Sequence, residues 1–98
     1  MKPQKIHPEA LEEYNQAAKS YTEIYPELGK RFHREIQRLL TEIQRSPSLY
    51  RHIEGVFQRH FSTTFPFAVI YVQETECIHI IAIMHMHREP GYWKLRAK

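Results

Sequence analysis

In the first half of the chain, apolar side chains recur every three or four residues, the spacing of one face of an α-helix. Pro8 suits the first helical position, and three glutamates follow it near the positive end of the helix dipole. The first apolar stripe stops at Pro26, and the second stops at Ser46 and Pro47. The stripes are Leu11, Tyr14, Ala18, Tyr21 and Tyr25, then Leu28, Phe32, Ile36, Leu39 and Ile43. The short turn at 25–27 predicts an antiparallel helical hairpin.

From Tyr50 onward the apolar period changes to two, which is typical of strands. We expect strands over 50–54, 56–62, 67–73 and 77–87, with a turn or bulge at Gly55 and a short edge strand over 2–7 before the helices. Residues 67–73 are apolar on both faces, as in a central strand. In 77–87, alternate side chains should lie on opposite faces, and we expect one face to cover the helices. That face holds Ile78, Ile80, Ala82, Met84 and Met86. The other face holds Cys77, His79, Ile81, Ile83, His85 and His87.

This order of elements predicts an α+β fold in one domain over residues 1–98. An N-terminal strand precedes an antiparallel helical hairpin, and a three- to four-stranded antiparallel meander packs on the helices. A chain of 98 residues is the size of a single core. Function is then expected on the sheet face that the helices leave open.

Composition adds modest constraints. Fourteen Lys and Arg against eleven Asp and Glu give a net charge of +3, which only weakly favours nucleic acid or an acidic partner. The lone Cys77 excludes an internal disulfide and suggests a reducing compartment. No apolar run approaches the roughly 20 residues of a membrane span, and the first residues lack the apolar core of a signal peptide. We therefore expect a cytoplasmic protein with no membrane association.

The two histidines near the carboxyl end raise the question of a metal. His85 and His87 are alternate residues of one predicted strand and would point the same way. His79, the next candidate ligand, would lie roughly 20 Å away at about 3.3 Å per residue. A zinc site needs at least a third ligand, so no metal and no cofactor are predicted. Packing and hydrogen bonding at the strand end are favoured over acid/base work for His85, and a surface position is favoured for His87.

Two segments resemble a known family. GVFQRHFSTTFPFAVIY (Gly55 to Tyr71) and HMHREPGYW (His85 to Trp93), with the order of elements around them, are similar to the ParE branch of the RelE/ParE superfamily. These are toxins of type II toxin-antitoxin modules. The resemblance covers nearly the whole chain. It implies a small cytoplasmic toxin that a cognate antitoxin wraps and blocks.

The resemblance leaves two mechanisms open. RelE-like relatives cut messenger RNA in the ribosome, which requires basic, acid/base and aromatic groups on one face. The candidates for that chemistry are Arg59, His85, Arg88 and Tyr92, with His60 as a further basic group. Most RNA-cutting relatives place an arginine where this chain has Ala68. That departure favours the ParE-like alternative, inhibition of DNA gyrase by binding. A third alternative is an interaction protein of the same fold that is not toxic.

The carboxyl end also supplies candidates for partner binding. We expect Trp93 to fold back over the core, and Arg88 either to pair with Glu89 or to contact a partner. The tail KLRAK is expected to be solvated. The second helix has a basic face that Glu35 and Glu42 interrupt, which we interpret as mostly solvated. The candidate partner-binding residues are Arg59, His87, Arg88, Lys94 and Arg96. A homodimer and a toxin-antitoxin hetero-oligomer both remain open.

Overall fold

The structure, a computed structural model, describes residues 1–97. Two helices, α1 (Pro8–Ile24) and α2 (Pro26–Arg45), form a long hairpin. The strands are β1 (Gln4–Ile6), β2 (His52–Glu54), β3 (Phe57–Phe61), β4 (Phe67–Gln73) and β5 (Ile78–His85), with short 3-10 turns η1 (Pro47–Leu49) and η2 (Lys94–Ala97). The predicted helices and strands are all present, although most strands are shorter than expected.

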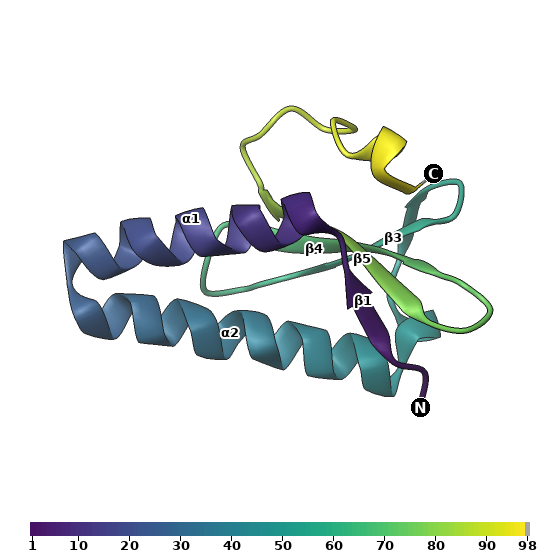
Figure 1. The fold of residues 1–98 in the computed structure, drawn as a ribbon, viewed down its shortest axis with the longest axis horizontal. Coiled ribbons are helices and arrows are strands. Elements are labelled where there is room, and N and C mark those ends of the chain that lie inside the picture. Colours follow the sequence, from purple (N-terminus) through teal and green to yellow (C-terminus); the bar gives the residue numbers. More distant parts are fainter. Residues whose placement is uncertain (98) are drawn as a thin grey trace.

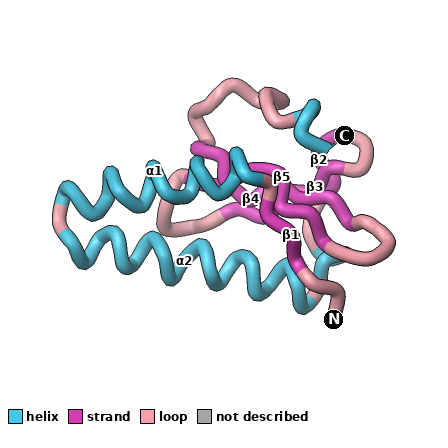
Figure 2. The backbone as a smooth tube through the Cα atoms, in the orientation of Figure 1, coloured by secondary structure: helices cyan, strands magenta, loops and turns pink. Residues whose placement is uncertain are grey.

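The five strands form one sheet, ordered β1-β5-β4-β3-β2 (Figures 1 and 2). Neighbours from β2 to β5 are antiparallel, and β1 joins the edge of β5 in parallel. The predicted α+β class and the meander are confirmed, and the parallel edge strand makes the sheet mixed. Gly55 lies in the turn between β2 and β3 at a φ of +56°, a conformation that glycine adopts without strain.

Both helices begin at a proline, which the sequence predicts for α1. Pro26 was expected within the turn and is instead the first residue of α2. The His7 side chain caps α1, because its Nδ1 accepts a hydrogen bond from the amide of Glu9 at 3.0 Å. The hairpin closes tightly near its turn, where a Cβ at Gly29 would lie 1.9 Å from the Thr22 hydroxyl and 3.1 Å from the Thr22 Cα. The absence of a side chain at residue 29 therefore allows α1 and α2 to approach.

An aromatic cluster fills the core between the helices and the sheet. Phe32 is fully buried at its centre. Its ring centroid lies 5.0 Å from that of Phe67, 5.1 Å from Tyr21, 5.4 Å from Phe65 and 5.8 Å from Tyr14. These spacings are typical of attractive aromatic pairs. The stripes predicted for the two helices thus meet β4 as expected.

A bulge in β5 changes which side chains face the helices. Ile70 pairs with Ala82, but the next residue, Tyr71, pairs with Ile80, so that Ile81 is an extra residue. An extra residue reverses the alternation of side chains beyond it. Ile78 and Ile80 cover the helices as predicted, but Ile83 does so as well, whereas Ala82 and Met84 pack on the opposite face. The strand also ends at His85, so the prediction for 86–87 is wrong.

The residues after β5 form a C-terminal arm, defined here as residues 86–97, that crosses the face of the sheet opposite the helices, called below the open face (Figure 1). Trp93 anchors the arm with only 3% of its surface exposed. Its indole N–H donates to the Met84 sulfur at 3.3 Å, and its ring lies 4.6 Å from that of Phe57. The prediction that Trp93 folds back over the core is therefore confirmed.

A polar network joins α2 to β3. Arg38 bridges Glu35 and Glu42 at 2.8 and 2.9 Å. Glu35 also accepts a hydrogen bond from the Ser62 hydroxyl, and Glu42 contacts His60 Nε2 at 2.7 Å. The hydrogen bonds from Arg38, with help from Ser62 and against the effect of burial, lower the pKa of Glu35 to about 2. The two carboxylates that interrupt the basic face in sequence are thus turned toward the sheet.

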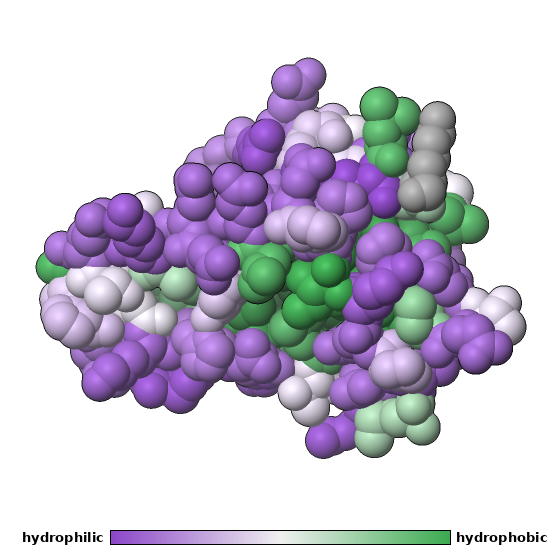
Figure 3. Space-filling view, viewed as in Figure 1, coloured by the Kyte–Doolittle hydropathy of each residue, from purple (hydrophilic) through white to green (hydrophobic). Residues whose placement is uncertain are grey.

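Apolar side chains also reach the surface between the helices and β1 (Figure 3). They line a small groove of about 80 Å³ that includes Ile6, Leu11, Tyr14 and Leu40.

Among residues 1–97, neither helix combines the length and the apolar character needed to cross a membrane.

Candidate functional site

His85 and His87 are neighbours, but not because they share a strand. His85 ends β5 on the side of the helices, with its ring 5.1 Å from that of Phe67. His87 lies in the turn that follows, where its amide donates to His85 Nδ1 at 3.1 Å. The two rings are 5.2 Å apart. The chain reversal, rather than strand alternation, brings the imidazoles together.

No third metal-binding side chain joins this pair. Within residues 1–97, no group of three His, Cys, Asp or Glu side chains is arranged to hold a metal ion. His79 stacks against His7 at 6.0 Å instead, and its Nδ1 lies 3.3 Å from a Glu74 carboxylate oxygen. Burial, with the nearby Lys5 charge, lowers the pKa of His79.

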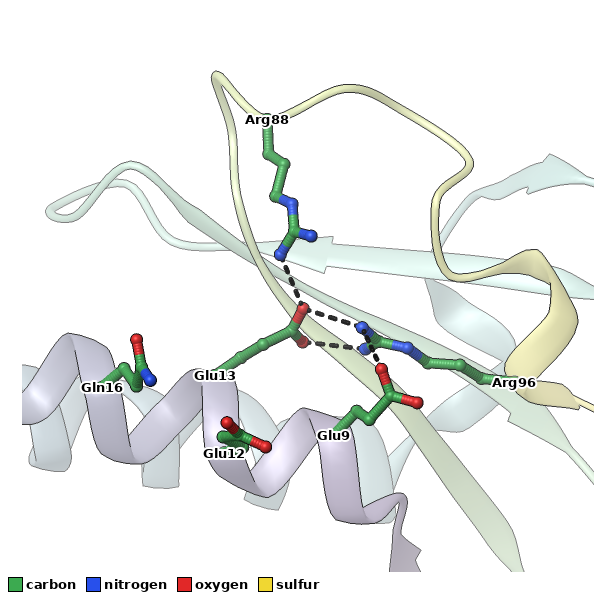
Figure 4. Close-up of a pocket in the computed structure, with 6 residues that line it drawn as sticks. All are labelled: Glu9, Glu12, Glu13, Gln16, Arg88 and Arg96. Carbon is green, nitrogen blue, oxygen red and sulfur yellow. Dashed lines mark hydrogen bonds and ion pairs between the residues drawn. The ribbon is translucent and has the colours of Figure 1, made fainter.

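The carboxylate of Glu13 is the centre of the candidate site (Figure 4). It extends from α1 to the C-terminal arm, and its two oxygens accept bonds from four residues. These bonds come from the amide of Ile83 at 3.1 Å, the guanidinium of Arg88 at 3.3 Å, the hydroxyl of Tyr92 at 2.6 Å and both terminal nitrogens of Arg96 at 3.0 and 3.2 Å. Glu13 therefore fixes the start, middle and end of the arm.

Arg96 is the main partner of Glu13. Its side chain is only 9% exposed, and it also reaches Glu9 at 3.3 Å and the carbonyl oxygen of Ile81 at 3.2 Å. The prediction of a solvated tail is thus wrong at Arg96, although Leu95 is exposed as expected. Arg88 was expected either to pair with Glu89 or to contact a partner, and it pairs with Glu13 instead of Glu89.

The surroundings of the Tyr92 hydroxyl favour its protonated form. Its hydroxyl donates to Glu13, and the Arg88 guanidinium lies 3.8 Å above its ring. Burial, together with the hydrogen bond to the carboxylate, raises the pKa of Tyr92 well above its usual range. A phenol held in this way is a hydrogen-bond donor and a poor general base near neutral pH.

The four nuclease candidates divide between two depressions. His85, Arg88 and Tyr92 line one of about 230 Å³, together with Glu13, Gln16 and Phe67. Arg59 lies instead on the open face, in a depression of about 300 Å³ beside Trp93 and Lys94. The first depression lies beside α1 and the second on the open face of the sheet. The sequence therefore grouped residues that the fold keeps apart.

Arg59 does lie close to Ala68, the position where RNA-cutting relatives carry an arginine. Phe61 pairs with Ala68, and Arg59 pairs with Ile70, on adjacent strands of the open face. Ala68 is fully buried. The other basic candidate of β3, His60, points to the opposite face, where its ring stacks on Tyr50 at 3.8 Å.

Sequence reasoning missed Glu13, which it treated only as a charge in the first turns of α1. The only indication in the sequence was that α1 carries a glutamate and the end of the chain carries an arginine that could pair with it. Their sequence separation of 83 residues gives no reason to pair them without the fold.

The helical hairpin packed on a sheet that contains the antiparallel meander is the α+β architecture predicted for a RelE/ParE-like chain, and the structure adds the parallel edge strand and the C-terminal arm. Comparison with family models matches residues 5–90 to the ParE toxin of the type II toxin-antitoxin system, parDE. The chain therefore belongs to this family, and it is a type II toxin whose partner is a cognate antitoxin. Comparison with curated proteins finds no match. The arm residues Tyr92 to Ala97 lie beyond the matched range.

Proposed function

We propose that this toxin inhibits DNA gyrase by binding it, and that its cognate antitoxin neutralises it by covering the same surfaces. The observation that carries the proposal is that the side chains needed for RNA cleavage do not lie together in one site. Arg59 and His85 line different depressions, and the Tyr92 hydroxyl is bound to Glu13. A nuclease would need these groups to converge on one phosphate.

The remaining chemistry favours binding as well. Arg88 and Arg96 direct their charge at Glu13, so less of it is available to stabilise a developing negative charge. His85 is then the acid/base group left in the smaller depression, without an adjacent arginine at residue 68. A protein–protein interface does not require these side chains to meet at one point, because separate residues can each contact the partner.

The surfaces proposed for partner contact lie on both sides of the C-terminal arm. Arg59 and Lys94 line the depression of the open face, and His87 and Arg88 are exposed near the start of the arm. Arg96 has a different proposed role, because its side chain is almost buried. It holds the arm in place, so that the exposed cations keep their positions.

Expression of the toxin without its antitoxin tests this proposal in cells. Gyrase inhibition predicts DNA-damage signalling and filamentous growth, and co-expression of the antitoxin should restore normal growth. RNA cleavage would instead give shortened messages and arrested translation. Unimpaired growth would show that the chain is not toxic.

The variants Arg59→Ala and His85→Ala separate binding from cleavage in the same cells. Loss of a general acid/base or phosphate-stabilising group typically lowers a catalysed rate by about 100-fold or more. We therefore expect neither variant to abolish toxicity, although Arg59→Ala should weaken partner contact. Message shortening that either substitution abolishes would contradict the proposal.

A further inference from the structure

Two arginines within residues 1–97 are partly buried rather than exposed, and their surroundings differ. Arg96 forms bonds with Glu13, Glu9 and a backbone carbonyl. The Arg59 side chain forms no ion pair or hydrogen bond with the part of the chain that the structure describes. Its guanidinium carbon lies 5.6 Å from the centroid of the Phe61 ring. The N–H groups of this partly buried cation are therefore available to an acceptor from a partner.

The depression that holds Arg59 has an apolar wall and a charged rim, to which Glu54 and Lys94 contribute beside Arg59. Met84 and Trp93 belong to the buried cluster of the open face, and Ile53 packs against it. Pro90 and Gly91 of the arm also line it. The volume of about 300 Å³ is at the lower end of ligand-sized pockets. An occupant therefore meets an apolar wall, the Arg59 guanidinium and the paired charges of Lys94 and Glu54.

The second cation of this depression, Lys94, already forms an ion pair. Lys94 Nζ lies 2.7 Å from a carboxylate oxygen of Glu54, which also lines the depression. Nucleic acids are bound by several cations that follow successive phosphates. A single free guanidinium beside a carboxylate does not provide such a track.

We propose that the Arg59 depression binds a side-chain carboxylate of the antitoxin, carried beside a large apolar residue. The carboxylate accepts two parallel hydrogen bonds from the guanidinium, which is the geometry arginine favours. The apolar neighbour packs on Met84 and Trp93. The inference rests on the proposed function in one respect: the carboxylate and its apolar neighbour are taken to belong to the antitoxin that neutralises the toxin.

Titration of the isotope-labelled toxin with a capped dipeptide, acetyl-Leu-Glu-amide, tests the site directly by NMR. We expect saturable shifts of the Arg59 Nε–H, the Trp93 indole N–H and the Met84 methyl signals, with a dissociation constant in the millimolar range. Acetyl-Leu-Gln-amide should bind about tenfold more weakly or worse, because it lacks the charge that arginine pairs with. Gyrase is absent from this measurement, so failure of the gyrase proposal would leave its result unchanged.

Two variants serve as a matched pair in the same titration. Arg59→Gln should abolish the shifts at Trp93 and Met84. Arg51→Gln removes an exposed arginine just before β2 and should preserve them. Equal binding of the Glu and Gln peptides, or no shift with either, would overturn the inference. So would preferential shifts of these signals by a thymidine oligonucleotide of about ten residues, which would identify a nucleic-acid site.

Discussion

Replacing Glu13 with alanine is expected to lower the free energy of unfolding by about 3–5 kcal/mol, the usual effect of removing one member of a buried ion pair. The substitution leaves the nearly buried Arg96 without its main acceptor, and it removes the partners of Arg88, Tyr92 and the Ile83 amide. The total stability of such domains is about 5–15 kcal/mol. Glu13→Ala should therefore remove a large share of it.

Urea unfolding followed by tryptophan fluorescence measures this effect, because Trp93 belongs to the arm that Glu13 fixes. Glu12→Ala is the control, since Glu12 is exposed on the same helix, and its effect should stay within about 0.5 kcal/mol. Hydrogen exchange should also accelerate in residues 86–97 of Glu13→Ala before it does so in β4. A Glu13→Ala protein as stable as Glu12→Ala would show that the arm is held by Trp93 alone.

Replacing Phe32 with alanine is expected to cost about 3–5 kcal/mol, the range observed when a large buried side chain is removed from a core. Phe32 is fully buried and contacts aromatic rings of α1, β4 and the loop before β4. Its removal would open a cavity at the point where the helices meet the sheet. Few other single substitutions should destabilise this chain as much.

Phe61→Ala provides the same chemical change at a surface position. Phe61 is 50% exposed on β3, and its recorded aromatic contact is with Arg59. We expect a loss of about 1 kcal/mol or less. Thermal unfolding of both variants measures the difference. Similar destabilisation by the two substitutions would contradict the placement of the core.

Periodicity was sufficient to predict the helices, the strand order along the chain and the central position of β4. The start of α1 at Pro8 and the doubly buried strand follow from local rules. The bulge at Ile81 was not predictable in this way, because its apolar neighbours on either side satisfy period two with or without an extra residue. The side-chain assignment from Ala82 onward therefore failed, although a strand was correctly predicted over most of 77–87.

The site was less predictable than the fold, because its contacts span most of the sequence. His85, Arg88 and Tyr92 were identified from the motif that ends the last strand, and the fold does bring them together. Glu13 could not be identified, since α1 offers several similar glutamates. Nor could the sequence indicate that Arg96 is buried while Arg59 lacks an ionic partner among residues 1–97. These differences arise from where the C-terminal arm lies on the sheet.

Incubation of the purified toxin with DNA gyrase and plasmid DNA tests the central claim most directly, with translating ribosomes on a defined message as the parallel reaction. The account predicts that toxin at concentrations comparable to gyrase blocks supercoiling or traps cleaved DNA, while the message remains intact. Unimpaired gyrase together with message cleavage in the ribosome would contradict it.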